Sequence, residues 1–207
     1  MAASMNPAAQ NLVSSLNGQP LLLMKMATLS LGKNYSIMDK DQRLLGTISL
    51  DASQNVTGAV ISSAVSQVAG SYVGRWAARR REYEYEVKDA QGQLAMHIRK
   101  GKGGNASIFQ VVDATTGGSF GHIDMRRSLF GGLKAAWIAP DGSQLMSSKG
   151  NIIRRKYKIV GANGAELGRV RHKILAIRDV WQLELDPGTN HLYSAIFATI
   201  LDFEKQM

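Results

Sequence analysis

The chain has 207 residues, which is enough for one domain with a full hydrophobic core. It contains no cysteine, so disulfide bonds, thiolate metal sites and cysteine nucleophiles are excluded. Its formal charge of +9 predicts affinity for polyanions, either nucleic acid or an anionic membrane surface.

The N-terminal residues differ in composition from the rest of the chain. Residues 1–19 are rich in Ala, Ser and Asn and show little periodicity, which predicts a flexible N-terminal tail, either mobile or loosely docked. No long apolar run there resembles a signal peptide, so we expect a cytoplasmic protein. The folded domain is expected to span residues 20–207 and to begin with a strand at residues 21–26.

A hairpin-sized unit of strand, turn and strand recurs along this domain. Its copies begin at Tyr35, Tyr85, Phe109, Ala135 and Tyr157. Aspartates 89, 113 and 141 stand at the turns, where a short carboxylate caps backbone amides. Residues 179–186 alternate apolar and polar side chains and predict a final strand. The units therefore predict an antiparallel meander of about twelve strands.

The last segment, residues 191–207, is apolar on nearly every side of a helix. Its large apolar residues are Leu192, Tyr193, Ile196, Phe197, Ile200, Leu201 and Phe203. Such a helix must be buried all round, and its apolar part is shorter than the ~20 residues that cross a bilayer. The predicted fold is mainly β: a closed antiparallel barrel around a central hydrophobic C-terminal helix, with one inserted helix.

The inserted helix is predicted at residues 51–81, where apolar residues follow helical spacing and small residues recur at every fourth position. The segment ends in Trp76 and three arginines, Arg79, Arg80 and Arg81, which suits a membrane interface. Its serines do not suit a transmembrane helix. Two interpretations remain, an interfacial helix with a basic flank and a surface helix that covers one end of the barrel.

Residues able to carry catalysis show no recognisable grouping. The four histidines, His97, His122, His172 and His191, lie in different units without metal-ligand spacing. We therefore predict a binding module and not an enzyme. The rival class is a hydrolase or transferase that uses His97 or His122 with a nearby carboxylate.

Basic residues follow a period of two along the hairpin of residues 154–173. They are Arg154, Lys156, Lys158, Arg169, Arg171 and Lys173. Asn163 and Gly164 predict a two-residue type I′ turn, which pairs Lys158 with Arg169 and Lys156 with Arg171. Like charges directly opposite one another cost stability, so this face either projects into water or meets an anion. We predict an anion site here, extended by Arg79, Arg80 and Arg81.

Three stretches of the chain form a recognisable set: YSIMDKDQRLLGTI, then YKIVGANGAELGRV followed by RHKILAIRDVWQLELDPG, and the closing apolar helix with ILDFE. Together they resemble the phospholipid scramblase and LURP-one-related families. Those families share the fold of the Tubby C-terminal domain, a closed twelve-stranded barrel threaded by a hydrophobic helix. The resemblance implies one Tubby-like barrel domain over residues 20–207, with residues 51–81 inserted.

The functions of these families divide. Scramblases are described as calcium-responsive movers of phospholipid, whereas Tubby domains bind phosphoinositide headgroups through basic residues. In this chain the acidic segment proposed as the scramblase calcium site is reduced to Asp179, Glu184 and Asp186. A tight calcium site needs six or more converging oxygens, so calcium-driven scrambling is not the favoured prediction.

We therefore predict a non-enzymatic module that binds anionic phospholipid headgroups or a membrane surface, peripherally from the cytoplasm. The alternatives are a calcium-responsive scramblase and a regulatory module that binds nucleic acid or protein. Nucleic acid is the less favoured polyanion because Tyr157, the aromatic residue of the basic strands, is expected to face the core. The sequence specifies neither the lipid nor the oligomeric state.

Overall fold

The computed structural model describes residues 5–26, 34–50, 82–101, 106–127, 133–151, 156–172 and 180–206. Their helices are α1 (Pro7–Leu16) and α4 (His191–Gln206). Their strands are β1 (Leu21–Met26), β2 (Asn34–Met38), β3 (Leu44–Leu50), β4 (Tyr83–Asp89), β5 (Leu94–Lys100), β6 (Ala106–Asp113), β7 (Ser119–Arg127), β8 (Leu133–Ile138), β9 (Gln144–Asn151), β10 (Lys156–Gly161), β11 (Glu166–His172) and β12 (Val180–Leu185).

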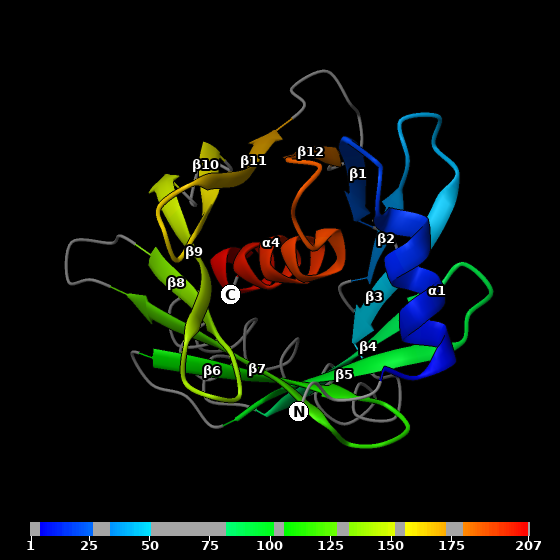
Figure 1. The fold of residues 1–207 in the computed structure, drawn as a ribbon, viewed down its shortest axis with the longest axis horizontal. Coiled ribbons are helices and arrows are strands. Elements are labelled where there is room, and N and C mark those ends of the chain that lie inside the picture. Colours follow the sequence, from blue (N-terminus) through cyan, green and yellow to red (C-terminus); the bar gives the residue numbers. More distant parts are fainter. Residues whose placement is uncertain are drawn as a thin grey trace, which may run out of the picture.

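The strands of the described residues form one closed antiparallel barrel (Figure 1). Each strand pairs with its neighbours in the sequence, and β1 pairs with β12 to complete the ring. Closure leaves no strand edge exposed for pairing with another chain. The predicted fold, a meander of about twelve strands closed into a barrel, is confirmed.

Helix α4 lies inside the ring of strands, as the apolar C-terminal segment predicted (Figure 1). Its large side chains from Leu192 to Phe203 are fully buried, apart from the partly buried Tyr193. Strand residues alternate accordingly: in β10, Tyr157 and Ile159 are buried, while Lys156 and Lys158 are exposed. The core is therefore the space between the helix and the inner face of the barrel.

Aromatic contacts hold both ends of α4. Near its start, the ring of Tyr193 stacks on Trp137 of β8, with centroids 4.7 Å apart. Near its end, Phe203 stacks on Tyr85 of β4 at 4.5 Å and meets the edge of Tyr35 of β2 at 5.0 Å. Such pairs add about 0.5–1.5 kcal/mol each beyond the area they bury, so they help to hold the helix in place inside the barrel.

Four hairpins share one type of turn. In each, the last residue before the turn forms two backbone hydrogen bonds: its carbonyl accepts from the N–H three positions on, and its N–H donates to the carbonyl four positions on, as Gly161 does with Gly164 and Ala165. The third turn residue has positive φ, and a register shift follows in the strands. The β6–β7 turn is one residue longer. This geometry is a type I turn closed by a bulge.

The β2–β3 turn departs from this pattern in one residue. Gln42 has φ of 63°, whereas Gly92, Gly142 and Gly164 stand at the equivalent positions of other turns. A side chain in the left-handed region costs about 1 kcal/mol or more, and glycine avoids most of this cost. We expect Gln42→Gly to raise the free energy of unfolding by about 0.5–1 kcal/mol in urea titration. Gln42→Ala should give no gain, and destabilisation by glycine would contradict this account.

Helix α1 occupies the segment predicted to be a flexible tail, and that prediction is wrong for residues 7–16. Asn6 caps the helix through its side-chain oxygen, which accepts from the Ala9 N–H at 2.8 Å. Pro7 stands in the first turn, where a missing N–H costs nothing. Ala9, Leu12 and Leu16 are fully buried in the main hydrophobic core, where α1 packs beside β3, β4, β5 and α4. Burial of this apolar face stabilises the helix.

Two polar contacts attach the ends of α1 to distant parts of the chain. At its start, the Asn6 N–H donates to Asp113 Oδ2 at 2.9 Å, and its side-chain amide donates to the Ala95 carbonyl at 2.8 Å. At its end, the ring of His191 lies between two backbone carbonyl oxygens, 2.8 Å from that of Leu16 and 3.1 Å from that of Asp186. The N-terminal segment is therefore part of the folded domain.

The predicted insertion at residues 51–81 lies outside the described residues. Among the helices that the structure describes, none combines the length and the apolar character needed to cross a membrane.

Candidate functional site

The basic hairpin has the predicted register. Lys156 lies opposite Arg171, Tyr157 opposite Val170, and Lys158 opposite Arg169. Tyr157 and Val170 are buried on the inner face of the barrel, so the four basic side chains point outward. The pairing of like charges across β10 and β11, inferred from the sequence, is therefore present in the fold.

The turn that sets this register differs from the predicted two-residue type I′ turn. Gly164 has φ of 79°, but Asn163 does not have positive φ. The loop has three residues, 162–164, and Val160 pairs with Glu166 while Ile159 pairs with Gly168. The extra loop residue shifts the pairing of the two strands by one position, and the bulged residue Leu167 shifts it back. The rest of the hairpin therefore has the predicted register.

The bulge decides which way Glu166 points. In a regular strand, Glu166 would share a face with the inward-facing Gly168 and Val170. Because Leu167 is an extra residue, the alternation reverses and the Glu166 side chain is exposed, 36% accessible, on the outer face. The sequence analysis missed Glu166, since a two-residue turn places it inside the barrel.

A fifth cation joins this surface from β9. Lys149 lies opposite Lys158 and is exposed. The sequence analysis missed it, although alternation outward from the buried Met146 gives its direction. We call the resulting surface the basic face; its members are Lys149, Lys156, Lys158, Arg169 and Arg171.

A cavity of about 820 Å³ lies at the basic face. All five cations line it, together with Gly150, Tyr157, Val160, Gly164, Glu166 and Val170. Cavities that bind small ligands measure about 300–1,000 Å³, so this one is large enough for a charged headgroup. The cavity thus has cationic walls.

Two carboxylates neutralise part of the basic face. Glu166 Oε2 lies 2.6 Å from Lys158 Nζ, and Glu166 Oε1 lies 2.7 Å from Arg169 Nη2. Glu184 Oε2 on β12 lies 3.6 Å from Arg171 Nη2. The hydrogen bond from Lys158, and a second from Arg169, hold the pKa of Glu166 below its ordinary value. Glu166 is therefore ionised at neutral pH.

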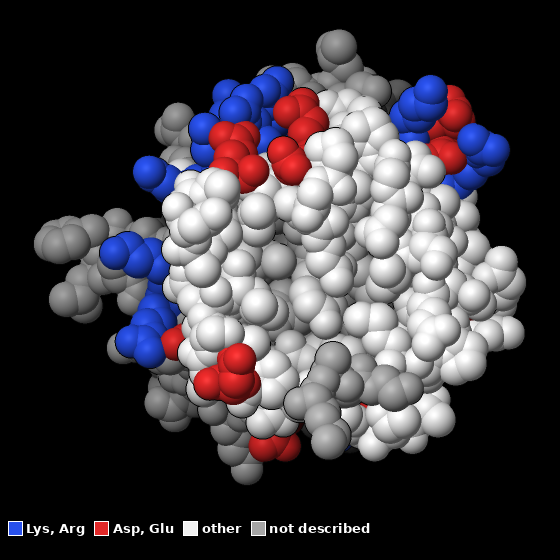
Figure 2. Space-filling model, in the orientation of Figure 1, with Lys and Arg blue, Asp and Glu red and all other residues white. Residues whose placement is uncertain are grey.

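Lys149 and Lys156 have no carboxylate partner among the described residues. Five cations against two carboxylates leave three positive charges on the basic face. Figure 2 shows Lys and Arg side chains gathered over the β10–β11 side of the barrel, with acidic side chains beside them. The electrostatics of this face favour an anion.

The remaining predicted anion-site residues cannot be placed on this face. Arg154, Lys173, Arg79, Arg80 and Arg81 lie outside the described residues. The site as described is therefore the β10–β11 part of the prediction, extended by Lys149 of β9.

Two of the three calcium-site candidates, Glu184 and Asp186, lie in the described residues and form other contacts. Glu184 contacts Arg171, and Asp186 Oδ1 accepts a hydrogen bond from the Gly188 N–H at 2.9 Å. Asp179 lies outside the described residues. Within the described ranges, no group of three or more His, Asp or Glu residues could hold a metal ion.

The histidines of the rival enzyme prediction lie away from the cavity. His97 Nδ1 on β5 lies 2.7 Å from Glu84 Oε1 on β4, but outside hydrogen-bond geometry. Arg99 Nε also lies 3.4 Å from this carboxylate. His122 stands on β7, paired with Gln110 in the sheet. Neither histidine lines the cavity at the basic face.

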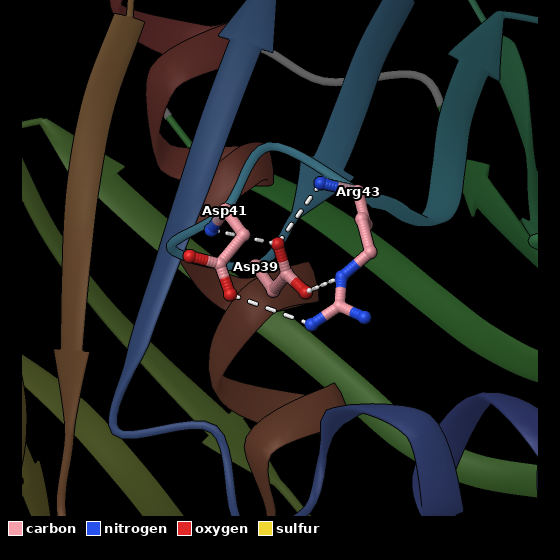
Figure 3. A network of polar contacts seen from close by, with 3 residues as sticks. All are labelled: Asp39, Asp41 and Arg43. Atoms are coloured by element: carbon pink, nitrogen blue, oxygen red, sulfur yellow. Dashed lines mark hydrogen bonds and ion pairs between the residues drawn. The ribbon is translucent and has the colours of Figure 1, made fainter.

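A second cluster of charged residues, at the β2–β3 turn, has a structural role (Figure 3). Asp39 accepts hydrogen bonds from the backbone N–H of Asp41 and of Arg43 and from Arg43 Nε, each at 2.9 Å. The Arg43 N–H lowers the pKa of Asp39 the most, against the opposing effect of desolvation. Asp89, Asp113 and Asp141 accept turn amides in the same way, which confirms their predicted capping role.

The fold and this site define a class: a closed antiparallel barrel threaded by its C-terminal helix, with a basic face on its outer surface. No model of a known protein family matches the chain, and no curated protein matches it. The structure is similar to the X-ray structure of an Arabidopsis thaliana protein, AT5G01750, with a TM-score of 0.55 over 91% of this chain and 93% of that one. The two are 15% identical, so the likeness is one of fold.

Proposed function

We propose that this protein is a non-enzymatic binding module for anionic phospholipid headgroups at a membrane surface, related to the scramblase and LURP-one-related families. The observation that carries this proposal is the basic face, where five cations line one cavity and three of their charges have no carboxylate to balance them. The shared barrel architecture of the Arabidopsis protein supports the family relationship at the level of fold.

The energetics of the basic face suit a charged surface. Each Lys or Arg near an anionic membrane contributes about 1 kcal/mol, so three uncompensated charges support binding that is measurable but weak. Attraction of this kind falls off over about 8 Å at physiological ionic strength. Binding is therefore expected to weaken steeply as salt is added.

The burial of Tyr157 favours lipid over nucleic acid as the partner of the basic face. Tyr157 is buried on the inner side of β10, where it cannot stack on a base, and its hydroxyl donates to the Ala198 carbonyl of α4 at 3.3 Å. Non-specific readers of single strands depend on exposed aromatic rings for base stacking. Membrane lipid is therefore the favoured source of the anion.

Lys156 gives the cleanest test, because its charge is unpaired among the described residues. We expect Lys156→Glu to weaken binding to vesicles of phosphatidylcholine with phosphatidylserine by about tenfold in a flotation assay, through reversal of one charge. Lys40→Glu makes the same change at the exposed β2–β3 turn and should leave binding nearly unchanged. The melting temperature of both variants should match that of the wild type.

Three results would count against this function. Undiminished binding by Lys156→Glu would remove the basic face from the site. Retardation of DNA at physiological salt as strong as vesicle binding would favour the nucleic-acid alternative. Binding or lipid movement that appears only with added calcium would favour the calcium-responsive scramblase.

A further inference from the structure

The carboxylate of Glu166 already occupies the centre of the basic face. Its Oε1 accepts a hydrogen bond from Arg169 Nε at 3.0 Å and lies 2.7 Å from Arg169 Nη2, and its Oε2 lies 2.6 Å from Lys158 Nζ. The two cations come from opposing strands and are held by one carboxylate between them. These contacts are the ones that the oxygens of a bound phosphate would make.

We propose that Glu166 is an internal competitor for the anion and sets the specificity of the basic face: a phosphomonoester dianion displaces it, and a phosphodiester monoanion does not. This inference rests on the function proposed above. It names the chemical class of the ligand and the residue that selects it.

Charge and number of oxygens account for the selection. A phosphodiester carries one negative charge, the same as the Glu166 carboxylate. Its replacement of Glu166 between Lys158 and Arg169 therefore brings no additional negative charge to these cations. A phosphomonoester carries roughly 1.5 to 2 negative charges at neutral pH and has three terminal oxygens. Because Glu166 is tethered in the site, its effective concentration there is roughly millimolar or higher. A free monoanion therefore competes poorly with it for Lys158 and Arg169.

The exchange is possible because the triad is open to solvent. The side chains of Lys158, Glu166 and Arg169 are 47%, 36% and 37% exposed. Exposed ion pairs contribute only about 0–1 kcal/mol to stability, so release of the carboxylate costs the fold little. The bulge at Leu167, which turns Glu166 outward, is what brings the competitor to the site.

The test compares two anionic lipids in phosphatidylcholine vesicles at pH 7.4: phosphatidic acid, a phosphomonoester, and phosphatidylglycerol, a phosphodiester. Vesicles are matched for zeta potential, so that long-range attraction is equal. We expect the wild type to prefer phosphatidic acid by about tenfold. Glu166→Gln should raise binding to phosphatidylglycerol by about fivefold and to phosphatidic acid by less than about twofold, so the preference falls.

Glu184→Gln is the matched control, because it removes one negative charge from the neighbouring strand. Among the described residues, Glu184 forms one ion pair, in which its Oε2 lies 3.6 Å from Arg171 Nη2. Its loss should raise binding to both lipids by the same factor and leave the preference unchanged. A preference that falls equally in both variants would show a general effect of charge and would overturn the role of Glu166.

The outcomes separate the two proposals. If the wild type binds neither anionic vesicle better than pure phosphatidylcholine, the proposed function fails, and this inference with it. If it binds both and Glu166→Gln keeps the wild-type preference, only this inference fails. Release from phosphatidic acid vesicles by added inorganic phosphate assigns the ligand to free phosphate, and retention assigns it to the lipid headgroup; the comparison of Glu166→Gln with Glu184→Gln decides the role of Glu166.

Discussion

Replacement of Phe197 by Asp is expected to unfold the protein. Phe197 is fully buried in the middle of α4, inside the ring of strands. An unpaired carboxylate there loses its hydration without gaining a partner, which costs about 4–5 kcal/mol or more. Domains of this size are stable by about 5–15 kcal/mol, so the variant should be insoluble or lack a cooperative thermal transition.

Phe197→Leu is the matched control for this change. It keeps the site apolar and removes volume, which we expect to cost about 1–2 kcal/mol and to leave a cooperative transition at a lower temperature. A soluble Phe197→Asp variant that melts cooperatively near the wild-type temperature would contradict the position of α4 as the core of the barrel.

The fold was predictable because its signals are local and repeated. A helix apolar on every side, as from Leu192 to Phe203, requires burial whatever surrounds it. Period-two alternation gave the inward and outward sides of β10 and β11 directly, and with them the outward direction of Lys156 and Lys158. The sequence was therefore enough to predict which basic side chains of these strands point outward.

Details that depend on one residue of register were not predictable. Asn163 and Gly164 fit a two-residue turn as well as a three-residue turn followed by a bulge, and both give the same pairing further along the strands. They differ in the direction of Glu166, since the bulge reverses the alternation at that position. The carboxylate that balances Lys158 and Arg169 was missed for this reason.

The docking of α1 was missed because it depends on contacts between distant residues. The Asn6 N–H finds its partner, Asp113, 107 positions along the chain. The composition of residues 1–19 resembles that of a mobile tail, and ten helical residues are too few to form a stable helix alone. Packing against β3, β4, β5 and α4, which come together in the folded barrel, makes this helix stable.

Asp113→Ala is expected to destabilise the protein by about 3 kcal/mol at pH 7, because it leaves several donors without an acceptor. The Asp113 carboxylate is buried and accepts from the Asn6 N–H, the Asn6 side-chain amide, and the backbone N–H of Thr115 and Thr116. Asp141→Ala is the matched control: it removes a capping carboxylate from an exposed turn and should cost about 1 kcal/mol. Urea unfolding at pH 7 measures both.

The effect of Asp113→Ala should depend on pH. Burial raises the pKa of Asp113, but the hydrogen bonds from Thr116, Asn6 and Thr115 outweigh it and hold the pKa below its ordinary value. The stabilisation is therefore complete above the unfolded-state pKa of about 4 and is lost as the pH falls through the lower folded-state pKa. The stability difference between wild type and Asp113→Ala should shrink in urea titrations below pH 4. A difference that stays constant down to pH 2, or equals that of Asp141→Ala at pH 7, would show that Asp113 does not link α1 to the barrel.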